Sequence, residues 1–198
     1  RYAFLALIGV SQYLTYGLMA FVIAAHYFTG IALDLVVLFA NVGASVGGII
    51  AMVLVDKFGS RKFATLSYLG GFLTMIPILA YVALFKNNIF LFYPLLLLNM
   101  IFSEFGWAVR TIYEPTLMPT TSRAFLVGLV RLPVITAYTL SVYLTSSFTE
   151  LDFIIYNMVL WGIGALSAGV WHIFGFDINK VPLEEITGEE KILQKTIQ

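Results

Sequence analysis

Six long apolar stretches, separated by short polar or glycine-bearing breaks, dominate the pattern of this chain. A helix needs about 20 apolar residues, each rising 1.5 Å, to cross the hydrocarbon core of a membrane. Backbone groups in hydrocarbon must bond within their own segment, and no period-two alternation indicates a barrel, so we predict helices. The predicted spans are residues 2–27, 33–55, 63–85, 89–112, 124–147 and 153–174. The hydrophilic residues 176–198 predict a solvent-exposed tail.

Composition agrees with this fold class, an all-α membrane protein with six transmembrane helices. Hydrophobic residues make up 60% of the chain and charged residues 11%, whereas soluble domains carry about 25% charged residues. So few charges cannot cover a water-facing surface, and the lipid bilayer is the expected partner. A formal net charge of +0 produces no long-range field to attract nucleic acid. The absence of cysteine from the sequence excludes disulfides and thiol chemistry.

Basic residues predict the orientation of the spans. Arg1, the turn at residues 57–62, Arg123 and the tail lysines all fall on one side if six helices alternate. The other side has only Lys86, and its last connection, residues 150–152, is acidic. Cytoplasmic connections carry the excess of lysine and arginine. We therefore expect a multi-pass protein of the cell (plasma) membrane with both termini in the cytoplasm.

Small residues recur every four positions on the second span, at Gly43, Gly47 and Ala51. Such a stripe lets two helix backbones approach closely. We expect this face to pack tightly against a neighbouring helix or to slide along it.

The turn after the second span resembles the signature of the major facilitator superfamily, Gly-x-x-x-Asp-(Arg/Lys)-x-Gly-Arg-(Arg/Lys). Residues 56–62 read Asp-Lys-Phe-Gly-Ser-Arg-Lys. The positions that match are Asp56, Lys57, Gly59 and Arg61. Met52 and Ser60 stand where the leading Gly and the first Arg are usual.

A second stretch, residues 113–128, is similar to a pattern found between the tenth and eleventh helices of sugar-porter and metabolite-symporter members. That pattern reads Tyr-x-Pro-Glu-x-Phe-Pro-Thr-x-x-Arg-(Ala/Gly)-x-x-x-Gly, and Thr116 departs from its Glu. Residues 183–186, Leu-Glu-Glu-Ile, resemble the segment after the twelfth helix of sugar porters. The order of these features corresponds to the carboxyl-terminal half of such a transporter.

The resemblance implies a fold of two six-helix bundles, each made of three-plus-three inverted repeats, that works by alternating access. The expected partner is then an amino-terminal six-helix half. The expected function is secondary active transport of a small polar solute (a sugar, polyol or organic acid), with protons as the coupling ion. A facilitative channel and a non-transporting membrane scaffold are the alternatives.

The same resemblance implies that charges at the turn latch neighbouring helices in one access state. The residues concerned are Asp56, Gly59, Arg61, Lys62 and, at the start of the fifth span, Arg123. Asp56 is expected to accept hydrogen bonds from Arg61 or from the first N–H groups of the next helix. Glu114 is the acidic alternative to the missing Glu at position 116. Anchoring of these cations to lipid headgroups is an equally open interpretation.

Two ionisable residues, Glu104 and Arg131, lie inside predicted spans, where charges are expensive and usually functional. Counted from the ends of their spans they lie roughly 12 Å and roughly 10 Å deep. Helices joined by a short connection are usually neighbours. We therefore predict that the two side chains pair directly or through water. A static ion pair and a proton-coupling or gating carboxylate both remain open.

Polar residues form a stripe on each of two spans. Residues 99, 103, 106 and 110 share one face of the fourth span, beside Trp107, and residues 12, 15 and 16 share a face of the first. The resemblance implies that these two helices line the central cavity. The predicted substrate-binding residues are Gln12, Thr15, Tyr16, Asn99, Ser103 and Trp107. Neutral and aromatic side chains suit sugars and polyols, arginines would suit a carboxylate, and interhelical hydrogen bonding is the structural alternative.

Motifs of other functional classes are absent from the sequence. It contains no Gly-rich phosphate loop between a strand and a helix and no Ser-His-Asp set. Its two histidines, His26 and His172, lack partners at metal-ligand spacing. We therefore expect no enzyme activity, cofactor or metal site.

Overall fold

The computed structural model describes residues 1–23, 27–84, 89–179, 181–182 and 186 of the 198. Six helices in it are long and apolar enough to cross a membrane, and no strand occurs among the described residues. They are α1 (Tyr2–Gly17) continued by the π-helical turn η1 (Leu18–Ile23), α3 (Ile31–Phe58), α4 (Ser60–Leu84), α5 (Ile89–Thr116), α6 (Arg123–Leu144) between the 3₁₀ turns η2 (Thr120–Ser122) and η3 (Thr145–Ser147), and α7 (Glu150–Phe174). The all-α membrane fold class is confirmed.

The helices extend beyond several predicted boundaries. The second helix runs to Phe58 and the third begins at Ser60, so Gly59 alone separates them. Gly59 has a φ of 78°, a conformation that glycine adopts without strain. The prediction ended the second span before Asp56 and began the third after Lys62, whereas a charged side chain at a helix end can reach water while its backbone stays helical. Residues 24–26 and residue 85 of the predicted spans lie outside the described part, as does the connection at residues 86–88.

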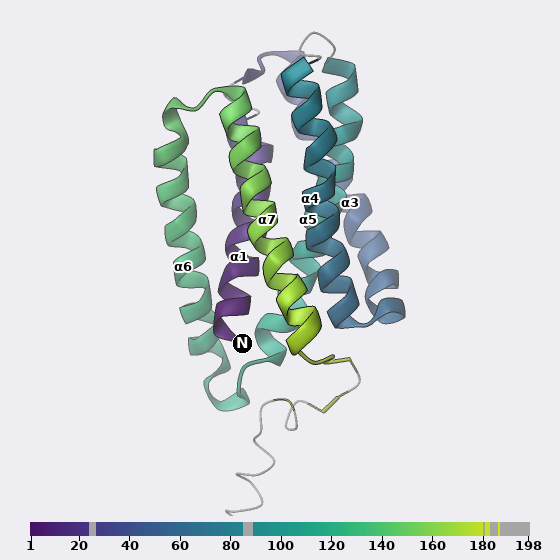
Figure 1. The fold of residues 1–198 in the computed structure, drawn as a ribbon, viewed down its shortest axis with the longest axis vertical. Coiled ribbons are helices and arrows are strands. Elements are labelled where there is room, and N and C mark those ends of the chain that lie inside the picture. The colour runs from purple at the N-terminus through teal and green to yellow at the C-terminus, as the bar shows by residue number, and fades with distance from the viewer. Residues whose placement is uncertain (24–26, 85–88, 180, 183–185, 187–198) are drawn as a thin grey trace, which may run out of the picture.

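The six helices pack in two layers. Helices α3, α5, α1 and α6 follow one another in the first layer, and α4 and α7 form the second. Figure 1 shows α4 and α7 nearest the viewer, with α3 and α6 at the two sides. The two central helices of the first layer, α1 and α5, therefore carry the core, and α3 and α6 are the least buried.

The main packing pairs are repeated when each of the first three helices is exchanged for its counterpart among the last three: α1 for α5, α3 for α6 and α4 for α7. Helix α1 packs on α6 and α7, just as α5 packs on α3 and α4. The pairs α1–α5 and α4–α7 map onto themselves under the same exchange. Because three crossings separate the two sets, equivalent helices run in opposite directions through the bundle.

The outward faces of the two layers differ in chemistry. Within residues 63–84 of α4 and 153–174 of α7, every exposed residue is apolar. The first layer instead exposes the polar residues Asn41, Thr111 and Arg131 between its apolar ones. The second layer therefore suits lipid, whereas the first suits water or another protein surface.

The basic residues gather at one end of the bundle. Figure 1 places the amino terminus, the α3–α4 turn, the α5–α6 connection and the end of α7 at the same, lower end. This arrangement confirms the predicted alternation of the six spans. That this end faces the cytoplasm stays a prediction.

Candidate functional site

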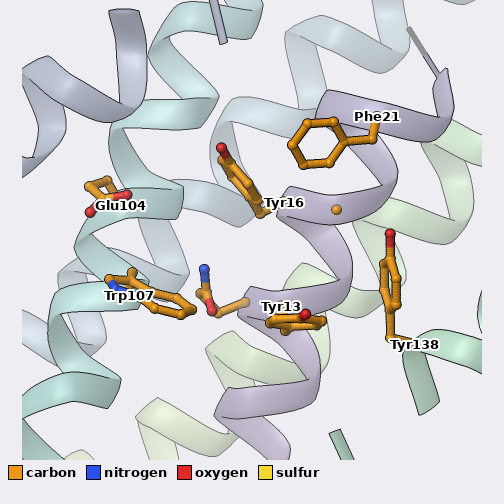
Figure 2. A pocket seen from close by; sticks show the side chains of 8 residues that line it. Tyr13, Tyr16, Phe21, Glu104, Trp107 and Tyr138 are labelled. Carbon is orange, nitrogen blue, oxygen red and sulfur yellow. The ribbon is translucent and has the colours of Figure 1, made fainter. Parts of the chain in front are cut away.

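A cavity of about 300 Å³ opens in the first layer, between α1, α5 and α6. Figure 2 shows its wall, with aromatic rings from all three elements and one carboxylate. The residues that line it are Gln12, Tyr13, Tyr16, Gly17, Phe21, Glu104, Trp107 and Tyr138. Tyr13 and Trp107, which line the cavity from α1 and α5 of the first layer, are also exposed at the surface. The cavity therefore opens on the outer face of the first layer, away from the second.

The aromatic wall is held in place by ring–ring contacts. Tyr13 and Tyr138 meet edge to face with centroids 5.3 Å apart, and Tyr16 and Phe21 do the same at 5.8 Å. A Cβ added at Gly17 would lie 2.5 Å from the Tyr138 ring, so only glycine lets this ring come so close to α1. The rings are therefore preorganised by packing between α1, η1 and α6.

Glu104 lies between two hollows. It lines the cavity just described and also a second hollow of about 390 Å³ between α3 and α5. The second hollow extends from Gly48 to Asp56 at the basic end of α3, a rise of roughly 12 Å along the helix. Gly47 and Gly48 border Glu104, where a Cβ on Gly47 would lie 2.9 Å from the Glu104 Cβ. The carboxyl group thus has space on both sides, toward the centre of the bundle and toward its basic end.

A buried charge cluster lies below the cavity, and Glu114 is its centre. Glu114 Oε1 accepts hydrogen bonds from Arg110 Nε at 2.9 Å and Nη2 at 2.7 Å, and Oε2 accepts from Arg131 Nε at 2.8 Å. Arg110 Nη1 donates to Gln12 Oε1 at 2.9 Å. The side chains of Arg110 and Glu114 are 5% and 1% exposed, whereas that of Arg131 is 51% exposed. Gln12 therefore joins this cluster to the cavity wall.

The prediction of a direct Glu104–Arg131 pair is wrong. Arg131 binds Glu114 instead, which lies ten residues, or roughly 15 Å, further along α5 than Glu104. The prediction counted depth from residue 112, but α5 continues to Thr116, so Glu104 lies deeper than estimated. In addition, α6 packs mainly on α1 and hardly on α5.

Three of the six predicted substrate-binding residues line the cavity: Gln12, Tyr16 and Trp107. The other three are buried in helix packing. Thr15 Oγ1 donates to the Ser11 carbonyl at 2.7 Å, and Asn99 Nδ2 donates to Thr74 Oγ1 at 2.8 Å. Ser103 is fully buried. The polar stripe of α5 faces α1 and α4 rather than the cavity, because Gly106 packs on Gln12 and Tyr68.

Sequence reasoning missed four residues of the cavity wall: Tyr13, Gly17, Phe21 and Tyr138. It named Glu114 only as an acidic alternative for the latch, although the spacing of Arg110 and Glu114, four residues apart on one helix, indicates an ion pair. Phe21 and Tyr138 carried no comparable signal. They read as lipid-facing aromatics, and only the packing of η1 and α6 around Gly17 brings them to the wall.

The turn between α3 and α4 is capped by a residue of the tail. Asp177 Oδ1 accepts hydrogen bonds from Ser60 Oγ at 2.6 Å and from Ser60 N–H at 3.2 Å. Ser60 Oγ in turn accepts from Ile178 N–H at 3.1 Å. The expectation that Asp56 receives the first N–H groups of α4 is therefore wrong, because Asp177 takes that position. Ser60, one departure from the family signature, binds the tail through Asp177 and Ile178, and Asn179 Nδ2 also donates to the Val55 carbonyl at 3.4 Å.

The other predicted gating residues are arranged as follows. Arg61 Nη1 donates to the Gly175 carbonyl at 3.3 Å and not to Asp56. Asp56 forms no ion pair within the described part of the chain, and Lys62 is exposed. Arg123 begins α6, and its Nε and Nη2 have no hydrogen-bond partner among the described residues. Glu114, the acidic alternative for the latch, binds Arg110 and Arg131 and not Arg123, so the predicted latch is not formed among the described residues of this structure.

Replacing Asp177 with alanine should loosen the α3–α4 turn. Loss of a helix N-cap costs about 0.5–2 kcal/mol, so amides of residues 59–62 should exchange hydrogen roughly 2- to 30-fold faster by mass spectrometry. Asp152→Ala removes the carboxylate half of the capping box of α7 at the opposite end and should leave the α3–α4 turn unchanged. Equal exchange at the turn in both variants would contradict the role of Asp177.

The same cap should depend on pH. Partial burial raises the pKa of Asp177, but hydrogen bonds from Ser60 and Asn179 outweigh it, so the pKa lies below its usual value, near 3.9. The stabilisation is therefore fully present above about pH 4 and is lost as the pH falls through the lowered pKa. Faster exchange at the turn below about pH 4, absent from Asp177→Ala, is the expected result.

Comparison with known proteins does not extend this description: no family model and no curated protein matches the chain.

Proposed function

We propose that this chain is one half of a secondary transporter of the major facilitator type, with the first layer facing a central solute pathway. The observation that carries this proposal is the contrast between the two layers. Within residues 63–84 of α4 and 153–174 of α7 every exposed residue is apolar, whereas α3, α5 and α6 expose Asn41, Thr111 and Arg131. Since polar side chains avoid lipid, a second bundle and a water-filled pathway are the natural cover for the first layer.

The exchange relation among the packing pairs supports the same proposal. Inverted repeats of three helices, related by a pseudo-two-fold axis, are a recurring architecture of secondary transporters, and their binding sites lie at the repeat interface. Here the two central helices, α1 and α5, are equivalent under the exchange. The cavity lies between these two helices and α6, where such a site is expected.

The position of Glu104 suggests how access could alternate. One hollow beside Glu104 is the cavity of about 300 Å³ between α1, α5 and α6, which is called the central cavity below. The other hollow leads toward Asp56 at the basic end. Movement of α3 along α5, on the glycines that border Glu104, would open one hollow and close the other. We propose Glu104 as the coupling carboxylate, with protons as the coupling ion. Its exposure to water from either side, rather than Arg131, would then set its charge state.

Cysteine labelling tests the water-filled pathway. The described chain contains no native cysteine, so Thr111→Cys in the second hollow and Leu69→Cys on the outward face of α4 form a matched pair. In proteoliposomes, a charged, membrane-impermeant methanethiosulfonate should modify Thr111→Cys at least tenfold faster than Leu69→Cys. Labelling is measured by mass shift.

The side of reagent addition separates the alternatives. A transporter in this state should react at Thr111→Cys from the basic end and slowly from the other, whereas a channel should react equally from both. A non-transporting scaffold, with its first layer covered by lipid or protein, should not react from either side. Either of the latter results contradicts the proposal.

A further inference from the structure

We infer that the central cavity binds a small organic cation, a quaternary ammonium or a protonated amine, as the solute. This inference rests on the proposed function and adds the chemical class of what is carried. It follows from the wall, which combines aromatic rings with a single carboxylate.

The aromatic part of the wall comes from separate elements that converge on one space. Figure 2 shows Tyr13, Tyr16 and Phe21 from α1 and η1, Trp107 from α5 and Tyr138 from α6 around the cavity. Tyrosine, tryptophan and phenylalanine rings attract cations through the negative face of the π system, and aromatic cages recognise quaternary ammonium groups in this way. The edge-to-face contacts between these rings hold them in place before a ligand arrives.

The charge of the wall has one sign. Glu104 is the acidic residue among those that line the cavity, and no lining residue is basic. Glu104 forms no ion pair with any residue that the structure describes. Of the two nearby arginines, both bound by Glu114, Arg131 lies outside the wall. Arg110 lies behind the wall, with its guanidinium over the Trp107 ring at 5.4 Å from the centroid, so the free ring faces of the cavity are those of the tyrosines and Phe21. A cation in the cavity would therefore find an anionic partner that no protein cation occupies.

Other solute classes fit this wall less well. An organic acid would face Glu104 without a cation in the wall to bind it. For a sugar, Gln12, the one amide in the wall, has its oxygen bound by Arg110 Nη1 at 2.9 Å and less free to accept a hydrogen bond from a hydroxyl group there. A volume of about 300 Å³ suits a compact ammonium ion.

A pair of ligands of equal shape tests the inference. Choline and 3,3-dimethylbutan-1-ol differ only in the charged nitrogen, which is carbon in the alcohol. Equilibrium binding of each to the full-length protein in nanodiscs should favour choline at least tenfold. Glu104→Gln should abolish most of that preference while leaving the affinity for the alcohol unchanged. Equal affinity of the wild-type protein for both ligands would overturn the inference.

Substitutions of an aromatic ring provide a second, independent test of the cation site. Tyr138→Leu should weaken choline binding at least threefold, whereas Tyr138→Phe, which keeps the ring, should retain it. Tyr143→Leu, on the exposed face of α6 outside the cavity, is the matched control and should bind as the wild type does. Unfolding temperature is measured for each variant. If Glu104→Gln does not fold, the Tyr138 pair decides, and equal binding by its two members counts against a cation site.

Failure of this inference can be told apart from failure of the proposed function. A protein that reacts at Thr111→Cys from the basic end but binds choline and the alcohol equally is a transporter of another solute class. A protein that does not react there refutes the pathway itself, whatever choline does.

Discussion

Replacing Glu114 with glutamine is expected to destabilise the bundle by about 3–5 kcal/mol. The carboxylate is 1% exposed and binds Arg110, which is 5% exposed, on one oxygen and Arg131 on the other. Without this carboxylate, the Arg110 guanidinium would remain buried inside the helix bundle with no counter-charge. Breaking a buried pair by removing one partner costs far more than the pair contributes relative to an apolar replacement. The measurement is the unfolding midpoint and free energy of the variant in detergent micelles.

Arg131→Gln is the control for this substitution. It removes the other ionic partner of Glu114, but the Arg131 side chain is 51% exposed, so screening by solvent limits its contribution to about 1 kcal/mol or less. The buried Arg110–Glu114 pair stays intact. If the two variants lose equal stability, the contribution of each ion pair does not depend on its burial.

Gly43→Ala is expected to destabilise the packing of α3 on α5 by about 1–3 kcal/mol. A Cβ at position 43 would lie 2.5 Å from the Leu97 carbonyl oxygen and 2.9 Å from the Met100 Cβ. The first obstacle is backbone, which cannot turn aside as a side chain can, so the two helices must separate. The loss should appear as a lower unfolding midpoint in detergent micelles.

Gly169→Ala is the matched control for that prediction. This glycine also lies inside a long helix, α7, but a Cβ there would meet nothing within 4 Å. Alanine favours helix over glycine by about 1 kcal/mol, so the control should gain stability while Gly43→Ala loses it. Changes of the same sign in both variants would show that helix propensity, and not the α3–α5 contact, governs position 43.

The glycine stripe shows how far local pattern reaches into tertiary structure. The spacing of Gly43, Gly47 and Ala51 predicted a close helix contact, and the structure confirms one for the two glycines, against the backbone at Leu97 and Ile101. The pattern could say which face of α3 packs closely, because small residues are visible in the sequence. It could not say that α5 is the neighbour, because residues around 43 and 97 meet only after the chain has crossed the bundle three times.

The candidate site shows the opposite case. Gln12, Tyr16 and Trp107 were recognisable as polar or aromatic residues on helices expected to line a cavity. Asn99 and Ser103 gave the same signal, but Asn99 bonds to Thr74 of α4 and Ser103 is buried inside the bundle. A polar stripe on a membrane helix can face protein as well as water. Tyr138 gave no signal because its role depends on the missing side chain of Gly17 on another helix.

Hydropathy by itself determined that this chain has six membrane-spanning helices, because the cost of placing polar groups in lipid is decided within about 20 consecutive residues. It also determined which ends of the helices lie together, because each span reverses the direction of the chain. Only the tertiary structure decided the rotation of each helix and the identity of its neighbours. Those features paired Arg131 with Glu114, placed Glu104 between two hollows and brought Asp177 to the α3–α4 turn. The physical reason is that they depend on side-chain fit between segments far apart in sequence, which no local pattern contains.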